Sequence, residues 1–345
     1  MSRPKALITG ITGQDGSYLA KSLLNDGYDV FGTSGPSGLK APWRFESLGI
    51  SNHENLKMLS WDITSPDETN RIISELQPKE IFNLASHSFV ADSLFNPQKT
   101  TLVSGFAPIN IMEAIGTSSR DTKFFQAGSS EMFGAATSAP QNEESSLFPR
   151  NIYGSAKVFA HSATVNYRQN RDLFTASGIL YNHESPLRGS EFVTKKITSN
   201  VAKVRLNQLD QLRIGNLSSL RDWGYAPEYV EAMRLIVGHE RPETFVIASG
   251  VATTVRDFVK AAFNAIDIDI SFEGSGLLEI GYEAGSGRKL VSVEKEFYRE
   301  SEEVTLVGDS DKARRLLGWK AETTVEEIVG LMVRHDLHEL KASKG

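Results

Sequence analysis

The stretch KALITGITGQDG, residues 5–16, decides the fold, because an apolar run passes directly into three closely spaced glycines. Residues 5–9 are expected to form a buried strand, and a helix is expected to begin at the glycines. Gly10 permits a tight turn, Gly13 lets the main chain approach a pyrophosphate, and Gly16 lets the helix pack closely on the sheet. Free N–H groups at the start of such a helix attract an anion. The stretch therefore predicts a dinucleotide-binding loop, with an ordinary strand-to-helix turn as the alternative.

Outward from this loop, the first half of the chain alternates short apolar runs with helical patterns. That alternation is typical of a parallel sheet with crossover helices, so the expected fold is a doubly wound α/β sheet of the Rossmann type. Further strands are expected at residues 28–32, 56–61, 80–85, 123–127 and 174–181. Ser65, Pro66 and Glu68 predict the start of a helix, with Ser65 as its cap and Glu68 completing a capping box.

After Asn182 the pattern changes to strands and helices separated by glycine- and charge-rich loops. Strands are expected at 245–248 and 304–307, and helices at 254–266 and 325–340. We expect residues 1–182 to form the dinucleotide-binding domain, together with a returning segment around 216–250. We expect residues 183–345 to form a smaller mixed α/β domain that binds the substrate.

The composition excludes several classes of function. The chain has 345 residues, of which 40% are apolar and 23% charged, an ordinary balance for a globular protein. Its net charge of -6 argues against a nucleic-acid-binding surface, and no run is apolar enough for a membrane helix, so a cytoplasmic location is expected. The absence of cysteine excludes disulfides, thiolate metal sites and a cysteine nucleophile. His335 and His338 lie close together without further nearby ligands, so no metal site is expected.

The identity of the dinucleotide depends on the turn after the second strand. Rossmann-type folds often place an acid there for the ribose 2′-hydroxyl, or an arginine nearby for a 2′-phosphate. Residues 33–38 contain neither an acid nor an arginine, so the turn leaves the 2′ group unassigned. Asp62, at the end of the third strand, is placed either to meet the adenine or to cap a turn.

Tyr153 and Lys157 are four residues apart and therefore share one face of a helix. An ammonium group beside a phenol favours the phenolate, so Lys157 is expected to lower the pKa of Tyr153 from about 10. A tyrosine tuned in this way takes a proton from a hydroxyl while hydride leaves the same carbon. The lysine is also able to hold the nicotinamide ribose. The alternative for the pair is a solvated helix surface.

Ser129, Ser130 and Glu131 follow the fifth strand, at the carboxyl edge of the sheet where ligands bind in α/β folds. A hydroxyl there is able to hydrogen-bond the oxygen that is oxidised. A carboxylate there is able to remove a carbon-bound proton, a task that a simple dehydrogenase does not require. The alternative is a polar loop with a helix cap.

Together these motifs resemble the GDP-mannose 4,6-dehydratase family, of the extended short-chain dehydrogenase/reductase class, along nearly the whole chain. The matching stretches are ALITGITGQDGSYLA at 6–20, NLAS at 83–86, SSEMFG at 129–134, YGSAK at 153–157, GILYNHESPLRGSEFVTKKIT at 178–198, LRDWGYAPEYVEAM at 220–233 and LGWK at 317–320. The NHESP and RDWG stretches are rarer than the glycine loop and separate this family from related epimerases and reductases. The resemblance implies a lyase that acts on a GDP-sugar, in the first place GDP-mannose.

The resemblance also implies roles for individual residues. Tyr153 matches the family's base and Lys157 its helper, while Ser129 stands where the family usually has threonine, and Ser130 and Glu131 match directly. The residues expected to hold the cofactor are Gly10, Thr12, Gly13, Gln14, Asp15, Gly16, Asp62, Ile63, Leu84, Ala85, Tyr153 and Lys157. The residues expected to contact the substrate are Ser88, Asn182, Val193 and Lys196, with Arg221 and Arg299 at its diphosphate and Glu302 at its ribose hydroxyls.

The chain departs from the family's pattern in three places. The family's Arg-Arg-Ser-Ser run, which grips the 2′-phosphate of NADP and helps to join dimers into a tetramer, is approximately PSGL at 36–39 here. Either NAD or NADP is therefore expected, with NAD favoured, and a homodimer is expected ahead of a homotetramer. The family's Ala-Gln before the next serine becomes SHS at 86–88, and its Arg-Pro near the end becomes RE at 299–300.

The reaction that the resemblance implies begins when Tyr153 takes the proton of the C4 hydroxyl and hydride passes to the nicotinamide. Glu131 then removes the C5 proton while water leaves C6, and hydride returns to C6 to give a 4-keto-6-deoxy sugar nucleotide. The same reaction on a GDP-heptose is the first alternative. A C4 epimerase or a ketoreductase is the second, although neither needs a base such as Glu131. A non-catalytic NAD(P)-binding sensor is the third, although such a protein needs neither Tyr153 nor Lys157.

Overall fold

The computed structural model describes residues 3–35, 43–136, 138–298 and 305–342. Its larger part is built on a seven-stranded sheet in which neighbouring strands are parallel. The strands run in the order β10 (Thr244–Ile247), β6 (Thr175–Leu180), β5 (Lys123–Ala127), β4 (Glu80–Asn83), β1 (Lys5–Thr9), β2 (Asp29–Thr33) and β3 (Leu56–Met58). The order reverses at β1, and ligands of such sheets bind beside this switch point. The predicted doubly wound α/β fold is confirmed.

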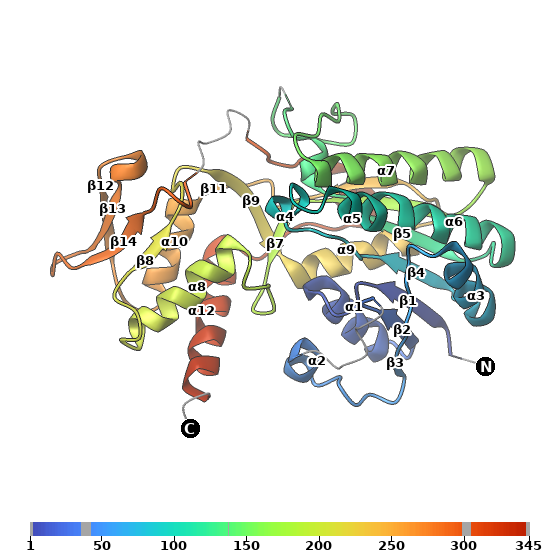
Figure 1. Ribbon diagram of the computed structural model, residues 1–345, viewed down its shortest axis with the longest axis horizontal. Coiled ribbons are helices and arrows are strands. Elements are labelled where there is room, and N and C mark those ends of the chain that lie inside the picture. The colour runs from blue at the N-terminus through green and yellow to red at the C-terminus, as the bar shows by residue number, and fades with distance from the viewer. Residues whose placement is uncertain (1–2, 36–42, 137, 299–304, 343–345) are drawn as a thin grey trace.

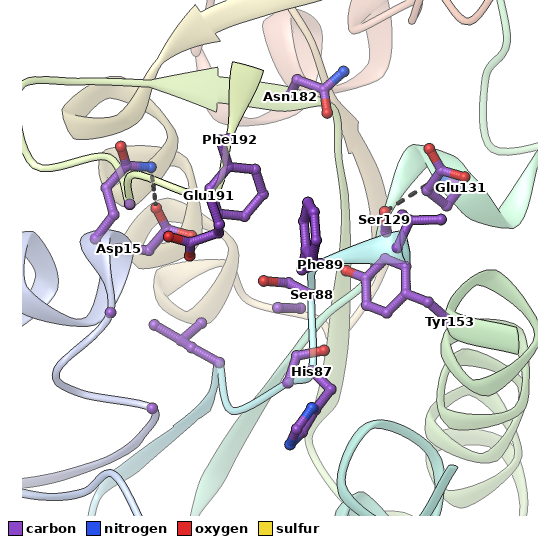
Figure 2. Close-up of a pocket in the computed structure, with 18 of the residues that line it drawn as sticks. Asp15, His87, Ser88, Phe89, Ser129, Glu131, Tyr153, Asn182, Glu191 and Phe192 are labelled. Atoms are coloured by element: carbon purple, nitrogen blue, oxygen red, sulfur yellow. Dashed lines mark hydrogen bonds between the residues drawn. The ribbon is translucent and has the colours of Figure 1, made fainter. Parts of the chain in front are cut away.

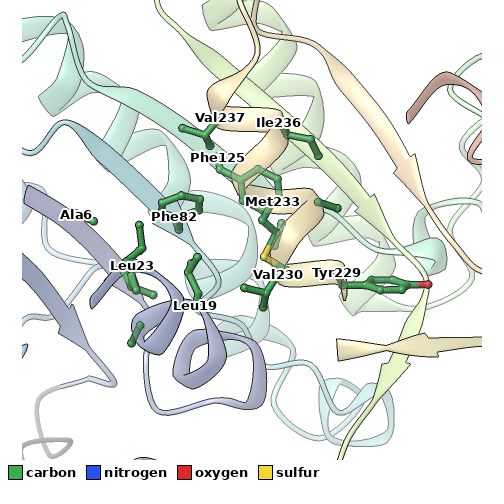
Figure 3. Packing of buried hydrophobic residues seen from close by; sticks show 14 of the residues in the cluster. Ala6, Leu19, Leu23, Phe82, Phe125, Tyr229, Val230, Met233, Ile236 and Val237 are labelled. Atoms are coloured by element: carbon green, nitrogen blue, oxygen red, sulfur yellow. The ribbon is translucent and has the colours of Figure 1, made fainter. Parts of the chain in front are cut away.

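Alternate side chains of the strands enter two hydrophobic cores, one on each face of the sheet. On one face, Ala6 and Ile8 pack beneath α1 (Gln14–Asn25) and α9 (Ala226–Gly238), whose apolar side chains meet the sheet in Figure 3. On the other face, Leu7 packs with α3 (Pro66–Leu76) and α6 (Ala107–Ser118). Helix α7 (Ile152–Arg171) lies beside α6 on this second face (Figure 1). Burial on both faces explains why the strands read as continuous apolar runs.

The smaller part of the molecule, on the left of Figure 1, holds two further sheets. One joins β11 (Ala252–Thr254), β9 (Leu220–Tyr225) and β7 (Asn182–Glu184). The other joins β12 (Ile270–Glu273), β13 (Ile280–Glu283), β14 (Lys289–Val293) and β8 (Leu212–Ile214). The helices that accompany them are α8 (Val193–Arg205), α10 (Val255–Asn264) and α12 (Val325–Ala342). Trp223, Phe258 and Met332 belong to the shared core of this part.

Short elements complete the described chain. They are α2 (Trp43–Leu48), α4 (Val90–Ser93), α5 (Pro97–Thr101), the π-helical turn η1 (Leu102–Phe106), the 3₁₀ turns η2 (Ser130–Met132) and η3 (Gly276–Leu278), and α11 (Asp311–Leu317). The turns η1 and η2 both border the large pocket described below.

Segments from the second half of the chain return to the large sheet. Strand β10 pairs with β6, α9 covers the sheet next to α1, and α11 packs against α9 and β10. The buried carboxylate of Asp222 fastens this return, since it accepts hydrogen bonds from the main-chain N–H groups of Ser249 (2.9 Å), Gly250 (2.9 Å) and Gly308 (3.1 Å). The division into residues 1–182 with 216–250, and residues 183–345, remains our proposal for the domain boundaries.

The strand predicted at residues 304–307 is wrong for the described residues 305–307, which form no strand. Gln141 explains the difference, because it takes up the backbone groups that a neighbouring strand would bond. Its side chain donates to the carbonyl oxygen of Thr305 (3.2 Å) and accepts from the N–H of Val307 (3.1 Å). The main-chain N–H of Gln141 also donates to the carbonyl oxygen of Val307 (2.8 Å). Residue 304 lies outside the described residues.

At the start of α3 the predicted cap by Ser65 is confirmed, but the predicted capping box with Glu68 is wrong. Ser65 precedes the helix, Pro66 opens it, and the Ser65 hydroxyl accepts from the N–H of Glu68 at 3.3 Å. The Glu68 carboxylate bonds the N–H of Asp62 at 2.9 Å, although the capping box predicts a bond to the N–H of Ser65. The glutamate therefore fixes the turn that leads from β3 into the helix.

Candidate active site

A pocket of about 1420 Å³ opens at the carboxyl edge of the large sheet and continues into the smaller part of the molecule. Pockets for one small ligand usually measure about 300–1,000 Å³, so this one has room for two ligands side by side. The predicted site residues that line it are Gly10, Thr12, Gly13, Gln14, Asp15, Gly16, Asp62, Ile63, Leu84, Ala85, Ser88, Ser129, Glu131, Tyr153, Lys157, Asn182, Val193, Lys196 and Arg221. One continuous pocket thus brings together residues from both halves of the chain.

Some predicted residues do not join this lining. Ser130 is buried with 3% of its surface exposed and does not line the pocket. Arg299 and Glu302 lie outside the described residues, as do residues 36–42, so the predictions about these positions stay predictions.

The glycine loop fits a bound dinucleotide. Gly10 has a φ of +69°, and a Cβ at this position would lie 2.8 Å from the main-chain nitrogen of Ala85. A Cβ at Gly16 would lie 2.5 Å from the carbonyl oxygen of Gly10, so only glycine lets the helix approach the loop this closely. Gly13 precedes α1 without any side-chain cap. The first N–H groups of α1 are therefore left for a phosphate.

The buried His183 and the partly exposed Asp15 lock the start of α1 to β7. The Nε2 of His183 lies 2.9 Å from Oδ2 of Asp15, and its Nδ1 lies 2.6 Å from the carbonyl oxygen of Tyr181. Both partners only accept hydrogen bonds, so both ring nitrogens carry a proton and His183 is an imidazolium. Burial alone would lower the pKa of His183, but the charge and hydrogen bond of Asp15 outweigh it and raise that pKa. Burial alone would raise the pKa of Asp15, but the charge and hydrogen bond of His183, with smaller contributions from other neighbours, outweigh burial and lower that pKa.

Gln14 strengthens the same connection. Its amide donates to the carbonyl oxygen of His183 (3.1 Å) and accepts from the hydroxyl of Ser185 (2.8 Å). The predicted cofactor residues Gln14 and Asp15 thus bond to the strand that carries Asn182, and their side chains are engaged within the protein. His183 was absent from the predicted site, although the NHESP stretch that contains it was singled out as rare.

Tyr153, Ser129 and Glu131 lie together on one wall of the pocket, opposite Asp15 and Glu191 (Figure 2). Tyr153 is 7% exposed, and burial raises the pKa of its phenol to about 12. Hydrogen bonding with the hydroxyls of Ser129 and Ser86 acts in the opposite direction but is the weaker influence. The prediction that Lys157 brings the pKa of Tyr153 below 10 is therefore wrong.

The position of Lys157 explains this correction. Its ammonium donates to the carbonyl oxygen of Ala127 (2.8 Å) and lies 5.8 Å from the centre of the Tyr153 ring. Burial lowers the pKa of Lys157 to about 8, because it disfavours the charged form of the lysine. The two residues do share the pocket from one helix face, but burial is the largest influence on the pKa of each and disfavours the charged form of both.

Glu131 is held by its neighbours on both sides. Ser129 caps the turn η2, since its hydroxyl accepts from the N–H of Glu131 at 3.2 Å. The side-chain amide of Asn151 donates to Oε2 of Glu131 at 2.7 Å. Asn151 was not predicted as a site residue. Its polar side chain two positions before Tyr153 was the available signal, but a helix cap accounts for that signal equally well.

The hydroxyl of Ser86 lies 2.9 Å from that of Ser104, a buried residue of the π-helical turn η1. The Ser104 hydroxyl also accepts from the N–H of His87 at 3.3 Å. Residues 86–88 depart from the family's pattern, and η1 thus fixes this segment beside Tyr153. The His87 imidazole lies 3.4 Å from the carboxylate of Asp92, within ion-pair distance.

Comparison with known proteins places the chain in a family. Residues 7–332 match the family model described as GDP-mannose 4,6 dehydratase. A GDP-mannose 4,6-dehydratase of Sinorhizobium fredii (strain HH103) is 40% identical over 348 residues, which cover 99% of each chain. The chain belongs to the GDP-mannose 4,6-dehydratase family. The family resemblance predicted from its motifs is confirmed.

Solved structures resemble this family member in fold. A dTDP-glucose 4,6-dehydratase from Bacillus anthracis in complex with NAD superposes with a TM-score of 0.78 at 15% identity, covering 98% of each chain. RMD from Pseudomonas aeruginosa complexed with NADPH gives a TM-score of 0.76 at 16% identity, covering 97% of this chain and 99% of the other. At these identities the likeness establishes the fold alone.

The end of the family member's pocket away from the glycine loop is lined by residues of the smaller part. Asn182 begins β7 and Val193 begins α8. The ammonium of Lys196 lies 3.4 Å from the centre of the Phe297 ring, and the Arg221 guanidinium donates to the carbonyl oxygen of Leu220 at 2.7 Å. Two cations therefore face a region that also contains an exposed aromatic ring.

Two arginines near the loop are not among the predicted site residues. Arg44 of α2 donates to the carbonyl oxygens of Thr12 (3.1 Å) and Leu187 (2.8 Å), across the mouth of the glycine loop. Arg188 stacks on Phe192 at 3.5 Å from the ring centre and was not predicted. Both arginines line the pocket and place positive charge around the expected cofactor site.

Asp62 keeps both of its predicted roles open. It lines the pocket, and its carboxylate also accepts from the N–H (2.9 Å) and the hydroxyl (2.7 Å) of Thr64, as a turn cap does.

Among the residues that the structure describes, His, Asp and Glu side chains nowhere gather in a group able to hold a metal ion. None of the described helices combines the length and apolarity needed to span a bilayer.

Proposed function

We propose that this chain converts GDP-mannose into GDP-4-keto-6-deoxymannose and water. The observation that carries the proposal is the joint presence of Tyr153 and Glu131 on one wall of the pocket that the glycine loop opens into. A phenolate is suited to accept the proton of a hydroxyl group, and a carboxylate is suited to accept a proton bound to carbon. The 4,6-dehydration needs both proton transfers. The S. fredii relative is named for the same reaction.

We infer that the glycine loop and α1 hold a nicotinamide dinucleotide. The fit of Gly10, Gly13 and Gly16 supports this, as do the NAD and NADPH in the two solved structures of the same fold. When bound there, the nicotinamide would supply the hydride chemistry of the reaction, the oxidation at C4 and the reduction at C6. Lys157 and Tyr153 line the pocket between the loop and the substrate end, where the nicotinamide ribose is expected.

Tyr153 is proposed to accept the proton of the C4 hydroxyl. Its pKa of about 12 means that the phenol keeps its proton in the free protein at neutral pH. Hydrogen bonds from the hydroxyls of Ser129 and Ser86 favour the phenolate. The Ser129 hydroxyl also serves to orient the oxygen at C4.

Glu131 is proposed to remove the proton from C5 once C4 is a ketone, which acidifies that C–H bond. The electron pair of the C5–H bond forms the C5–C6 double bond, and the C6 hydroxyl leaves as water with the proton that Glu131 has taken from C5. Lys196 and Arg221 are proposed to contact the nucleotide part of the substrate, with Arg221 at the diphosphate, a task that suits a planar fork of donors.

The test of the function is direct. Purified protein is incubated with GDP-mannose, a GDP-heptose, GDP-glucose and UDP-glucose, and mass spectrometry follows the loss of one water molecule. We expect water loss with GDP-mannose. Loss with the heptose alone would favour the first alternative substrate, and an isomer of unchanged mass would favour an epimerase. No turnover of any sugar, with cofactor bound, would favour the sensor.

We propose that NAD is accepted at least as well as NADP. Residues 33–35 offer neither an acid nor an arginine, and Arg44 already bonds two main-chain carbonyl groups. Mass spectrometry of the cofactor released from purified protein tests this. Release of NADP alone would contradict the proposal and would point to a cation such as Arg44 as its 2′-phosphate ligand.

We propose a homodimer formed through helices of the larger part. Exposed apolar side chains gather around α5, η1 and α7, namely Phe95 (82% exposed), Leu102 (50%), Phe106 (49%) and Phe159 (42%). Phe106 and Phe159 already contact each other, with ring centres 5.0 Å apart. A tetramer through residues 36–39 is the alternative.

The cytoplasmic location stays a prediction from the sequence.

A further inference from the structure

The side chain of Asn151 makes two hydrogen bonds in opposite directions. Its carbonyl oxygen accepts from the N–H of Gly154 at 2.7 Å, which makes Asn151 the N-cap of α7. Its amide nitrogen donates to Oε2 of Glu131 at 2.7 Å. One side chain therefore joins the helix that carries Tyr153 to the carboxylate of Glu131.

The chemistry of the partners fixes the orientation of this amide. A main-chain N–H only donates and a carboxylate only accepts, so the Asn151 oxygen must face Gly154 and its nitrogen must face Glu131. The flipped amide would place an oxygen against the carboxylate and an NH₂ group against an N–H. The two bonds therefore support each other and hold a single rotamer.

The main chain around Glu131 is packed equally tightly. A Cβ on Gly154 would lie 2.5 Å from the carbonyl oxygen of Glu131, so the turn η2 rests directly on the first turn of α7. Ser129 fixes the N–H of Glu131 from the other side. Among the described residues, Oε1 of Glu131 accepts no hydrogen bond, which leaves this oxygen for a proton from a ligand.

We propose that Asn151 is a positioning residue for Glu131, an inference that rests on the proposed role of Glu131 as the C5 base. The asparagine holds Oε2 and so aims Oε1 at the substrate carbon. Because the same side chain caps α7, the distance between the base for C5 and the base for C4 is set by one rigid unit. A displacement of about 1 Å at a reacting group is able to cost about 100-fold in rate.

The decisive variant is Asn151→Ser. Serine keeps a cap acceptor for the N–H of Gly154 but lacks the amide donor that reaches Glu131. Oxidation at C4 depends on Tyr153 and is expected to survive. Removal of the C5 proton is expected to slow about 10- to 100-fold, so reduced nicotinamide accumulates on addition of substrate. A substrate deuterated at C5 is expected to show a larger isotope effect on kcat than it shows with the wild-type protein.

Two controls separate positioning from helix capping. Thr254 is the N-cap of α10, and its hydroxyl accepts from the N–H of Asp257 at 3.0 Å. Thr254→Ala removes this cap and is expected to leave the rates of the two reaction steps in their wild-type proportion. In a Glu131→Gln background, Asn151→Ser is expected to cause little further loss, because its effect passes through Glu131. If Asn151 had only a structural role, Asn151→Ser would slow both the oxidation at C4 and the proton removal at C5. It would then reduce the rate in the Glu131→Gln background by the same factor as in the wild-type protein.

The outcomes are distinct. Accumulated reduced cofactor, a raised C5 isotope effect and non-additivity with Glu131→Gln support the proposal. An active wild-type protein whose Asn151→Ser variant keeps normal proportions of the two steps contradicts the positioning role alone. A wild-type protein that dehydrates no GDP-sugar contradicts the proposed function, and the positioning role with it. Asn151→Asp provides a second variant that keeps the cap, and it should slow the C5 step further because it sets a carboxylate against Glu131.

Discussion

At the scale of single residues, Glu131 is the position where the proposed reaction is easiest to interrupt. Glu131→Gln keeps the size of the side chain and removes the proton acceptor. The variant should bind substrate, oxidise C4 and stop before water is lost, because Tyr153 and Lys157 are unchanged. Absorbance of reduced nicotinamide should rise while 4-keto-6-deoxy product falls about 10²- to 10⁴-fold.

Tyr153→Phe is the matched control for this prediction, since its block comes one step earlier and should give neither signal. Wild-type protein in deuterated water should place deuterium at C5, because that proton passes through an exchangeable carboxyl group. Near-normal turnover of Glu131→Gln would remove Glu131 from the mechanism. His87, which lines the same pocket, would be the next candidate for the base.

His161 provides a pH-dependent prediction. Burial lowers its pKa to about 4, so the folded protein holds it neutral beside Ser177 while the unfolded chain protonates it near 6.5. Its contribution to stability is complete above pH 6.5 and is lost as the pH falls towards 4, by at most about 3 kcal/mol. Urea unfolding at pH 7 and pH 4.5 should show this loss in the wild-type protein and a smaller loss in His161→Gln. Equal losses in both would contradict it.

The residue types in the candidate site were predictable, but their electrostatic state was not. Tyr153 and Lys157 follow from their spacing on a helix, and the glycine loop follows from its place after β1. The pKa of Tyr153 depends on how deeply the phenol is buried, which the sequence does not encode locally. His183 and Asn151 escaped for a related reason, because each gains its importance from a partner far away in the chain, Asp15 and Glu131 respectively.

At the scale of elements, α8 and α12 are joined by a buried ion pair. Lys195 bonds the carboxylate of Asp336, which is 5% exposed and also accepts from the hydroxyl of Thr198 at 2.7 Å. Asp336→Ala leaves the ammonium of Lys195 buried without its counter-charge and should lower the free energy of unfolding by about 3–5 kcal/mol. Denaturant titration measures this change.

The control for the ion pair is the double variant Lys195→Met with Asp336→Leu, which replaces both charges by apolar side chains. It should recover most of the lost stability, because no charge is then left buried alone. A double variant as unstable as Asp336→Ala would show that packing, and not charge, accounts for the loss.

Predictions of elements succeeded where apolar runs are buried on both faces of the sheet. The strands β1, β5 and β6 lie at the predicted positions to within one residue at each end, because their neighbours leave no other place for the runs. The strand predicted at residues 304–307 is absent from the described residues 305–307 because Gln141, a distant glutamine, bonds the backbone that a strand would use. A polar side chain that replaces a neighbouring strand leaves no periodic trace in the sequence.

At the scale of the whole molecule, the exposed aromatic pair Phe106 and Phe159 should lie in the dimer interface. Phe106→Glu places a charge in that apolar surface and should convert the dimer into a monomer, which light scattering measures. Phe148→Glu, at another exposed aromatic side chain (65% exposed), tests how far the interface extends. A wild-type monomer, or a Phe106→Glu protein that remains a dimer, would contradict the proposed interface.

The return of the chain to its large sheet also sets the order of events during synthesis. Strand β10 pairs with β6, yet roughly 60 residues, which include β7, α8 and α9, separate them in the chain. At about 5 to 20 residues per second, a ribosome needs several seconds to deliver them. During that interval the β6 edge and the sheet face that α9 will cover are open to water. A nascent chain that ends before residue 244 therefore carries the glycine loop, Tyr153 and Glu131 on a sheet that still lacks its last strand, with the edge of β6 open to pairing with another chain.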